Sequence, residues 1–176
     1  NLLEPQTGQF EMEVDNNLLS LRFAVINTVN STSAVLRILN SSINISANNL
    51  SSMKKQNEYF ISLLNKRNGL IVFSGPTGSG KTTTLYSLLK VAKDKKIYTL
   101  EDPIEVFNED FVQIQINEES GFDYEAGIKQ ILRHDPDIIM IGEIRDDKAA
   151  KMAVGAANTG HLVLTTIHAS SASSVV

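Results

Sequence analysis

Residues 75–82 read GPTGSGKT, which places three glycines, a lysine and a threonine at fixed spacing. The pattern G-x-x-x-x-G-K-[ST] suits phosphate binding, because its glycines let backbone N–H groups turn toward phosphate oxygens. We expect Lys81 to reach the β- and γ-phosphates of a nucleotide and the Thr82 hydroxyl to ligate Mg²⁺. The predicted site for ATP and Mg²⁺ consists of Gly75, Pro76, Thr77, Gly78, Ser79, Gly80, Lys81, Thr82 and Thr83.

Polar residues also follow three apolar segments further along the chain. They are Glu101, Asp102 and Glu105 after residues 97–100, Glu143, Arg145 and Asp146 after residues 138–141, and Thr165, Thr166 and His168 after residues 162–164. Acidic residues at strand ends are often only solvated. However, the carboxyl ends of parallel strands meet at one edge of a sheet, where active groups gather. We therefore expect these groups to converge on the phosphate loop.

Phosphoryl transfer needs a held metal, an oriented water and neutralised charge, and acidic side chains can supply the first two. Glu143 ends a hydrophobic segment, so we expect it to hold Mg²⁺ together with Thr82. Either Glu105 or Glu101 is predicted to orient or deprotonate the attacking water.

Two histidines flank the apolar segment 162–164. His161 and His168 are seven residues apart, so in a strand they lie on opposite faces. We expect His168, at the carboxyl end, to sense or bind the γ-phosphate. His161, at the other end, fits a structural hydrogen bond equally well.

From residue 70 onward, apolar segments alternate with segments of helical periodicity. Strands are predicted at residues 70–73, 97–100, 112–116, 138–141 and 162–164, and helices at residues 85–92, 124–132 and 149–156. The apolar segment 70–73 reads as a buried parallel strand. This alternation is typical of an α/β fold with a mostly parallel sheet covered on both faces.

The chain before residue 70 has a different pattern. Residues 10–39 predict short strands, residues 40–52 (NSSINISANNLSS) a polar linker, and residues from 53 a helix capped near Ser51 or Ser52 and ended by Gly69. We expect residues 1–39 to end a small, mainly β N-terminal domain. Residues 53–176 would form the nucleotide-binding domain, which we expect to continue beyond Val176.

Composition narrows the choice of partners. The net charge is −4, which gives no basic surface for direct binding of nucleic acid. The chain has no cysteine and no apolar run near the ~18 residues of a membrane span. We therefore expect a cytoplasmic protein without membrane insertion.

Taken together, four segments resemble the secretion-motor ATPases of type II secretion, type IV pili and the competence pseudopilus. They are GPTGSGKTTTLY (75–86), similar to the Walker A box, TLEDPIE (99–105), similar to the aspartate box, LRHDPDIIMIGEIRD (132–146), similar to the Walker B box, and TGHLVLTTIHA (159–169), similar to the histidine box. They follow the family's order and spacing, and they look nearest to the Gram-positive competence assembly ATPases. The resemblance implies a RecA-like P-loop core.

The resemblance extends weakly upstream, to residues 21–23 and 36–39. It implies that Arg22 and Arg37 approach the terminal phosphate when domains close, a task for which the planar guanidinium is suited. The family usually has a Pro and a Gly-Glu pair between them, whereas residues 24–33 here read AVINTVNSTS. The alternative is two arginines on a solvated strand face.

The resemblance implies a ring, hexameric in the family, that hydrolyses MgATP to assemble pilin-like subunits. It would act at the cytoplasmic face of the membrane through an inner-membrane platform protein. Three alternatives stay open: a pilus retraction motor, a hexameric nucleic-acid motor, and a nucleotide-binding scaffold with little hydrolysis.

Overall fold

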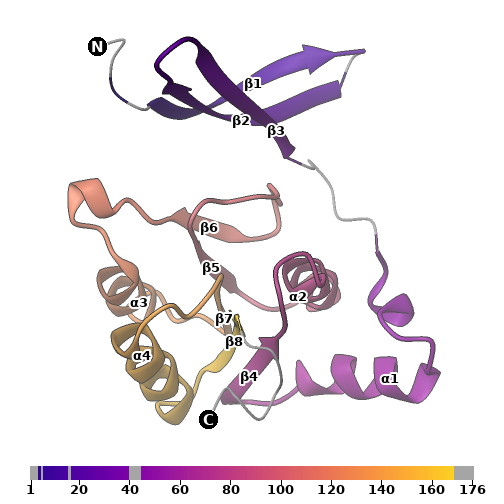
Figure 1. Ribbon diagram of the computed structural model, residues 1–176. Helices are drawn as coiled ribbons and strands as arrows, with labels where there is room; N and C mark the ends of the chain where they lie inside the picture. Colours follow the sequence, from indigo (N-terminus) through magenta and orange to yellow (C-terminus); the bar gives the residue numbers. More distant parts are fainter. Residues whose placement is uncertain (1–3, 5, 16, 40–44, 169–176) are drawn as a thin grey trace. The chain divides into compact units, whose positions relative to one another are not determined.

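The computed structural model describes residues 4, 6–15, 17–39 and 45–168. Its contacts divide the chain into two units, Asn1–Ile43 with Glu105–Phe107, and Asn44–Ile104 with Asn108–Val176. Each unit has its own β-sheet (Figure 1). The predicted linker falls at the junction, with residues 40–44 outside the described residues and residues 47–49 forming the short helix η1 (Ala47–Asn49).

The first unit is an antiparallel sheet of three strands in the order β1 (Gln6–Val14), β2 (Asn17–Asn27) and β3 (Thr32–Leu39). This confirms the predicted β structure, which begins four residues earlier than expected at Gln6. Side chains alternate between the two faces of a strand, and the pairing register makes one face almost wholly apolar. That face carries Phe10, Met12, Leu19, Leu21, Phe23, Val25, Leu36 and Ile38.

The helix predicted after the linker is α1 (Lys54–Leu63), which ends at Leu63 and not at Gly69, the first residue of β4. Its N-cap is Met53, which makes no side-chain capping bond, so the predicted serine cap is wrong. Ser51 Oγ instead accepts a hydrogen bond from Met53 N at 3.1 Å, and Asn57 Oδ1 accepts one from Ser51 N at 2.8 Å. The buried Asn57 side chain therefore fixes the turn before the helix.

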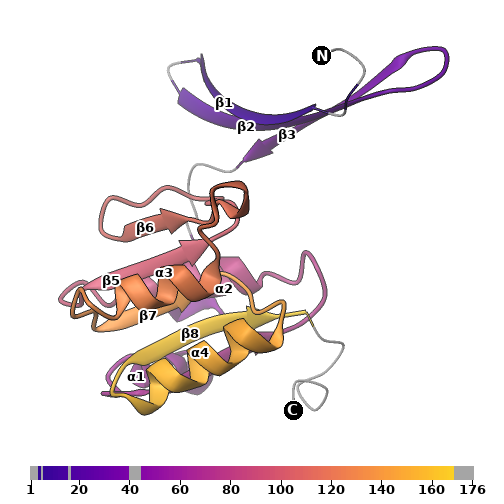
Figure 2. The ribbon, with the colours of Figure 1, turned by 90° about the vertical axis from the view of Figure 1, so that its left-hand side faces the viewer.

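The second unit is an α/β domain. Its five strands are all parallel, in the order β4 (Gly69–Ser74), β8 (Leu162–Ile167), β7 (Ile138–Ile141), β5 (Ile97–Glu101) and β6 (Val112–Gln115). Helix α2 (Lys81–Leu89) covers one face, and α3 (Tyr124–Ile131) and α4 (Asp147–Asn158) cover the other (Figures 1 and 2). These elements confirm the α/β class and every strand and helix predicted after residue 70.

One expectation about burial is wrong. Strand β4 was predicted to be fully buried, yet it lies at an edge of the described sheet and Leu70 is exposed. The apolar run 70–73 cannot distinguish an edge from the centre of a parallel sheet, because its hydrophobicity is the same in both cases. The central strands β7 and β8 are buried as expected.

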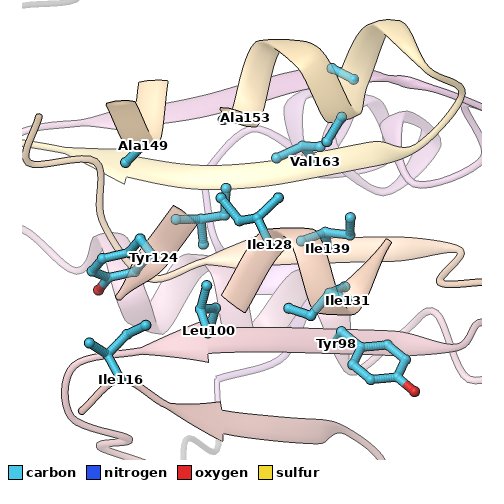
Figure 3. Packing of buried hydrophobic residues seen from close by; sticks show 13 residues of the cluster. Tyr98, Leu100, Ile116, Tyr124, Ile128, Ile131, Ile139, Ala149, Ala153 and Val163 are labelled. Carbon is cyan, nitrogen blue, oxygen red and sulfur yellow. The ribbon is translucent and has the colours of Figure 1, made fainter. Parts of the chain in front are cut away.

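The core on the α3/α4 face is tightly packed (Figure 3). Leu100, Ile128, Ile139 and Val163 are fully buried there. Helix α3 comes so close to β5 that a Cβ added at Gly127 would lie 2.6 Å from Leu100 Cδ1. Glycine at position 127 therefore permits this approach.

Candidate functional site

The phosphate loop joins β4 to α2, as its motif requires. Gly78 and Gly80 have φ angles of 77° and 86°, in the left-handed region that favours glycine. A Cβ at Gly75 would lie 2.7 Å from Ser79 Oγ, so a larger residue would obstruct the loop. Backbone conformation at Gly78 and Gly80, and a close contact at Gly75, therefore favour glycine at all three positions of the loop.

The start of α2 suits an anion. Gly80 is its N-cap and offers no side-chain capping bond, so the first N–H groups of the helix are available to a ligand. Lys81 Nζ donates to the carbonyl oxygens of Gly75 at 2.9 Å and Pro76 at 3.0 Å, within the loop itself. The charge of Lys81 is therefore held within the loop itself.

Four of the polar residues predicted at the ends of β5, β7 and β8 contact one another at one edge of the sheet, whereas Glu101 is buried elsewhere and Asp146 caps α4. Arg145 joins two of them, because Nη1 donates to Asp102 Oδ2 at 2.8 Å and its guanidinium also binds Glu143. His168 Nε2 lies 3.0 Å from Glu143 Oε2. We call Asp102, Glu143, Arg145 and His168 the edge cluster.

Backbone bonds between strand ends support the edge cluster. Gly142 N donates to Leu100 O at 2.8 Å, and the buried Thr166 hydroxyl donates to Gly142 O at 2.7 Å. A Cβ at Gly142 would lie 3.3 Å from Leu100 O, so the chain is closely packed at this point. The position of Glu143 is thus set by both neighbouring strands.

Electrostatics keep Arg145 charged. Partial burial acts to lower its pKa, but hydrogen bonds and charges from Glu143 and Asp102 outweigh burial and raise the pKa above its ordinary value. Nearby, burial raises the pKa of Tyr124, and the charge of Arg145 only partly offsets this, so the phenol stays neutral.

Glu101 and Glu105, the two candidates for the residue that orients water, differ in burial. Glu101 is 3% exposed, and its carboxylate accepts hydrogen bonds from Tyr86 and Thr99. Glu105 is exposed, in the loop between β5 and β6. Two glutamines of β6 hold this loop on either side of Glu105, since Gln115 Oε1 accepts from Ile104 N at 3.3 Å and Gln113 Oε1 accepts from Asn108 N at 2.7 Å.

The two arginines of the first unit face each other across β2 and β3. Arg22 is the register partner of Arg37, and both are exposed on the face opposite the apolar one. Like charges at directly opposed positions repel, which destabilises the sheet unless an anion compensates.

The histidines differ in their surroundings. His161 Nδ1 lies 3.2 Å from Ala156 O and 3.4 Å from Thr159 Oγ1, which are contacts between the end of α4 and the start of β8. This arrangement favours the structural interpretation of His161. His168 is half-exposed and belongs to the edge cluster.

In the part of the chain that the structure describes, no three His, Asp or Glu side chains form a metal-binding group. A P-loop magnesium site needs fewer protein ligands, because phosphate oxygens and water complete the shell. Thr82 at the start of α2 and Glu143 in the edge cluster are oxygen donors of the kind Mg²⁺ prefers. Their chemistry therefore fits this cation.

Sequence reasoning did not assign a role to Arg145, Tyr86 or Gln113. Arg145 was visible as the one cation among the acids after residues 138–141. Tyr86 and Gln113 gave no signal, because a tyrosine in an apolar helix face and a glutamine in an alternating strand look like ordinary core and surface residues.

The chain belongs to the type II/IV secretion system proteins, whose family model matches residues 3–176. It is 46% identical over 168 residues to competence protein ComGA of Bacillus subtilis (strain 168), covering 94% of this chain and 47% of ComGA. It is 38% identical over 173 residues to the type IV pilus assembly ATPase PilB of Pseudomonas aeruginosa, covering 96% of this chain and 31% of PilB.

Solved structures agree with this assignment. The pilus retraction motor PilT with bound ADP superposes with a TM-score of 0.77 at 32% identity, covering 93% of this chain and 48% of PilT. The ATPase DotB of Legionella pneumophila gives a TM-score of 0.82 at 23% identity, covering 98% of this chain and 50% of DotB, which supports the fold. The chain spans about half the length of the ComGA proteins it matches.

Among the described helices, none has the length and apolar character needed to cross a bilayer.

Proposed function

We propose that the protein is a motor ATPase that hydrolyses MgATP to power the assembly of pilin-like subunits in a competence, type IV pilus or type II secretion system. The observation that carries the proposal is the edge cluster, which belongs to the same sheet edge as the phosphate loop. Family membership and the similarity to ComGA and PilB support the assembly role.

In this proposal each residue has a distinct task. The loop Gly75 to Thr83 would surround the phosphates, with backbone N–H groups donated by its residues other than Pro76, and Lys81 would neutralise the β- and γ-phosphates. Bound Mg²⁺ would neutralise charge that develops on the phosphate oxygens. Thr82 and Glu143 would hold the cation, and Arg145 and His168 would keep the Glu143 carboxylate oriented.

Glu105 is the better candidate for orienting or deprotonating the attacking water. Its side chain is exposed, whereas the Glu101 carboxylate is buried and engaged by Tyr86 and Thr99. Arg22 and Arg37 would stabilise the charge of the transferred phosphoryl group when the first unit closes over the nucleotide.

We infer the assembly context from the relatives. The protein would act as a homo-hexamer at the cytoplasmic face of the membrane, bound to an inner-membrane platform protein. Residues 1–39 would end a small N-terminal domain, 40–52 would link it to the ATPase domain, and 53–176 would belong to that domain.

The test is the steady-state ATPase rate of full-length Glu105→Gln. We expect turnover to fall by about 10²- to 10⁴-fold, the range for loss of a general base, with nucleotide affinity retained. Glu109→Gln, a change of another exposed acid in the same loop, is the matched control and should hydrolyse ATP like the wild type. Wild-type protein with no measurable turnover would instead favour a nucleotide-dependent scaffold.

The similarity to PilT makes retraction the second candidate. A cell that lacks an assembly motor should lose its surface filaments, whereas a cell that lacks a retraction motor should accumulate them. Counting filaments on a deletion strain distinguishes the two.

A further inference from the structure

A buried polar network lies between α2 and the sheet, on the face opposite α3 and α4. Glu101, the last residue of β5, is at its centre and is 3% exposed. The Tyr86 hydroxyl lies 2.8 Å from each carboxylate oxygen, and Thr99 Oγ1 donates to Oε1 at 2.6 Å. Tyr86 is fully buried.

Strand β6 adds a third element to this network. Gln113 Nε2 donates to the Tyr86 oxygen at 2.8 Å and lies 3.4 Å from Glu101 Oε1. The other end of the same amide accepts from Asn108 N, in the loop that carries Glu105. One set of hydrogen bonds thus connects α2, β5, β6 and this loop.

The two ends of the network are adjacent to site residues. Tyr86 lies four residues after Thr82 in α2, so the two side chains are on one helix face a single turn apart. Glu101 directly precedes Asp102, which binds Arg145 and through it Glu143. The network is therefore connected to both groups that we propose as magnesium ligands, to Thr82 through one turn of α2 and to Glu143 through Asp102 and Arg145.

We propose that Glu101 is a positioning residue that acts through Tyr86 to fix α2, and with it Lys81 and Thr82, relative to the edge cluster. The inference rests on the proposed function. It assigns Glu101 a task other than proton transfer, because its carboxylate is buried between β5 and α2 and accepts a hydrogen bond from the phenol of Tyr86 in α2. Buried networks of this kind hold elements in one arrangement, since an unpaired member is costly.

The test compares two buried hydroxyls of the same helix in the full-length protein. Tyr86→Phe removes the bond from α2 to Glu101. Ser87→Ala removes a hydroxyl that donates to Thr83 O, within the helix, at 2.7 Å. For Tyr86→Phe we expect kcat to fall about 10- to 100-fold and the Mg²⁺ concentration for half-maximal turnover to rise severalfold, because misplacement by about 1 Å costs this much.

Nucleotide affinity should change less than kcat in Tyr86→Phe, and both kcat and the Mg²⁺ dependence should stay near wild type in Ser87→Ala. All rates are measured well below each variant's melting temperature. A merely structural role would lower that temperature and leave the Mg²⁺ dependence unchanged, which would overturn the proposal.

A second pair of variants separates positioning from chemistry. Glu101→Gln keeps an oxygen that can accept from Tyr86, so it should retain much more turnover than Glu101→Ala. Equal loss in both would show that the carboxylate itself reacts and would also overturn the proposal. If the wild type does not hydrolyse ATP, the proposed function fails; if it does, and Tyr86→Phe behaves like Ser87→Ala, only this inference fails.

Discussion

At the scale of single residues, the site is organised by cations that bind their own chain. Lys81 contacts carbonyl oxygens of the phosphate loop, and Arg145 bridges Asp102 and Glu143. Each cation is therefore paired with oxygen atoms of the protein before an anionic ligand binds, and could exchange them for oxygens of the ligand. This pairing lowers the electrostatic cost of holding the cation in the free protein.

Replacing Lys81 by alanine should abolish ATP hydrolysis and weaken nucleotide binding sharply. The change removes the only lysine of the loop, whose charge would contact the β- and γ-phosphates. Titration with a fluorescent ATP analogue and a steady-state rate measure the two effects. Lys93→Ala, at an exposed position beyond α2, is the control. A Lys81→Ala rate near wild type would contradict the phosphate-loop assignment.

Replacing Glu143 by glutamine should preserve nucleotide binding but remove Mg²⁺-dependent turnover. The amide keeps the shape of the side chain but lacks the charge that pairs with Arg145 and, in the proposed function, would hold the cation. Rates across a Mg²⁺ series, with Glu118→Gln as an exposed control, measure the effect. An unchanged Mg²⁺ dependence would assign the metal to another acid, with Asp102 next to test.

At the scale of secondary structure, the approach of α3 to β5 sets the core behind the edge cluster. Asp123 and Asp146 start α3 and α4 by accepting hydrogen bonds from Ala126 N and Ala149 N, each at 2.8 Å. Gly127 then lets α3 contact Leu100 directly. The packing of these helices thus supports the strand ends that carry the site.

Two glycine-to-alanine changes should have opposite effects on stability. Gly127→Ala would crowd Leu100 and should lower the free energy of unfolding by about 1–3 kcal/mol. Gly155→Ala, in α4 with no atom within 4 Å of the added Cβ, should raise it by roughly 0.5–1 kcal/mol through helix propensity. Urea unfolding of both variants measures the difference, and equal effects would contradict the packing described for α3.

At the scale of the whole molecule, the proposed mechanism needs both units. In that mechanism the first unit would contribute Arg22 and Arg37, and the second would contribute the phosphate loop and the edge cluster. Groups that stabilise only the transition state need not hold the bound nucleotide.

Arg22→Ala and Arg37→Ala should therefore each lower turnover and leave nucleotide affinity largely intact. Arginines that complete P-loop sites contribute about 10³- to 10⁵-fold in rate. The comparison requires the full-length protein, with Arg67→Ala, outside the proposed site, as the control. Wild-type rates in both variants would leave the pair as ordinary strand residues.

Much of the α/β domain could be predicted from sequence, because apolar runs and glycine motifs are local signals. The phosphate loop, the parallel strands and the strand-end polar groups are of this kind. The serine cap before α1 and the burial of β4 were predicted wrongly, since both depend on neighbours distant in sequence. The partners of Glu101 escaped prediction for the same reason, because Tyr86 and Gln113 meet it only in the folded chain.

The pairing register of β2 with β3 has a consequence for natural variation in the hairpin. The tip of the hairpin is residues 28–31, and it is closed by Thr28 N, which donates to Ser31 O at 2.7 Å. The strand pairing that places Arg22 opposite Arg37 lies outside the tip. Thr28 and Ser31 also close the tip through their side chains, whereas Val29 and Asn30 can be replaced while the arginines keep their places. A single inserted residue that slipped the pairing by one would instead turn one arginine onto the apolar face, because side chains alternate with period two. Homologous hairpins should thus differ in tip composition, and in length by even steps, more readily than by one residue.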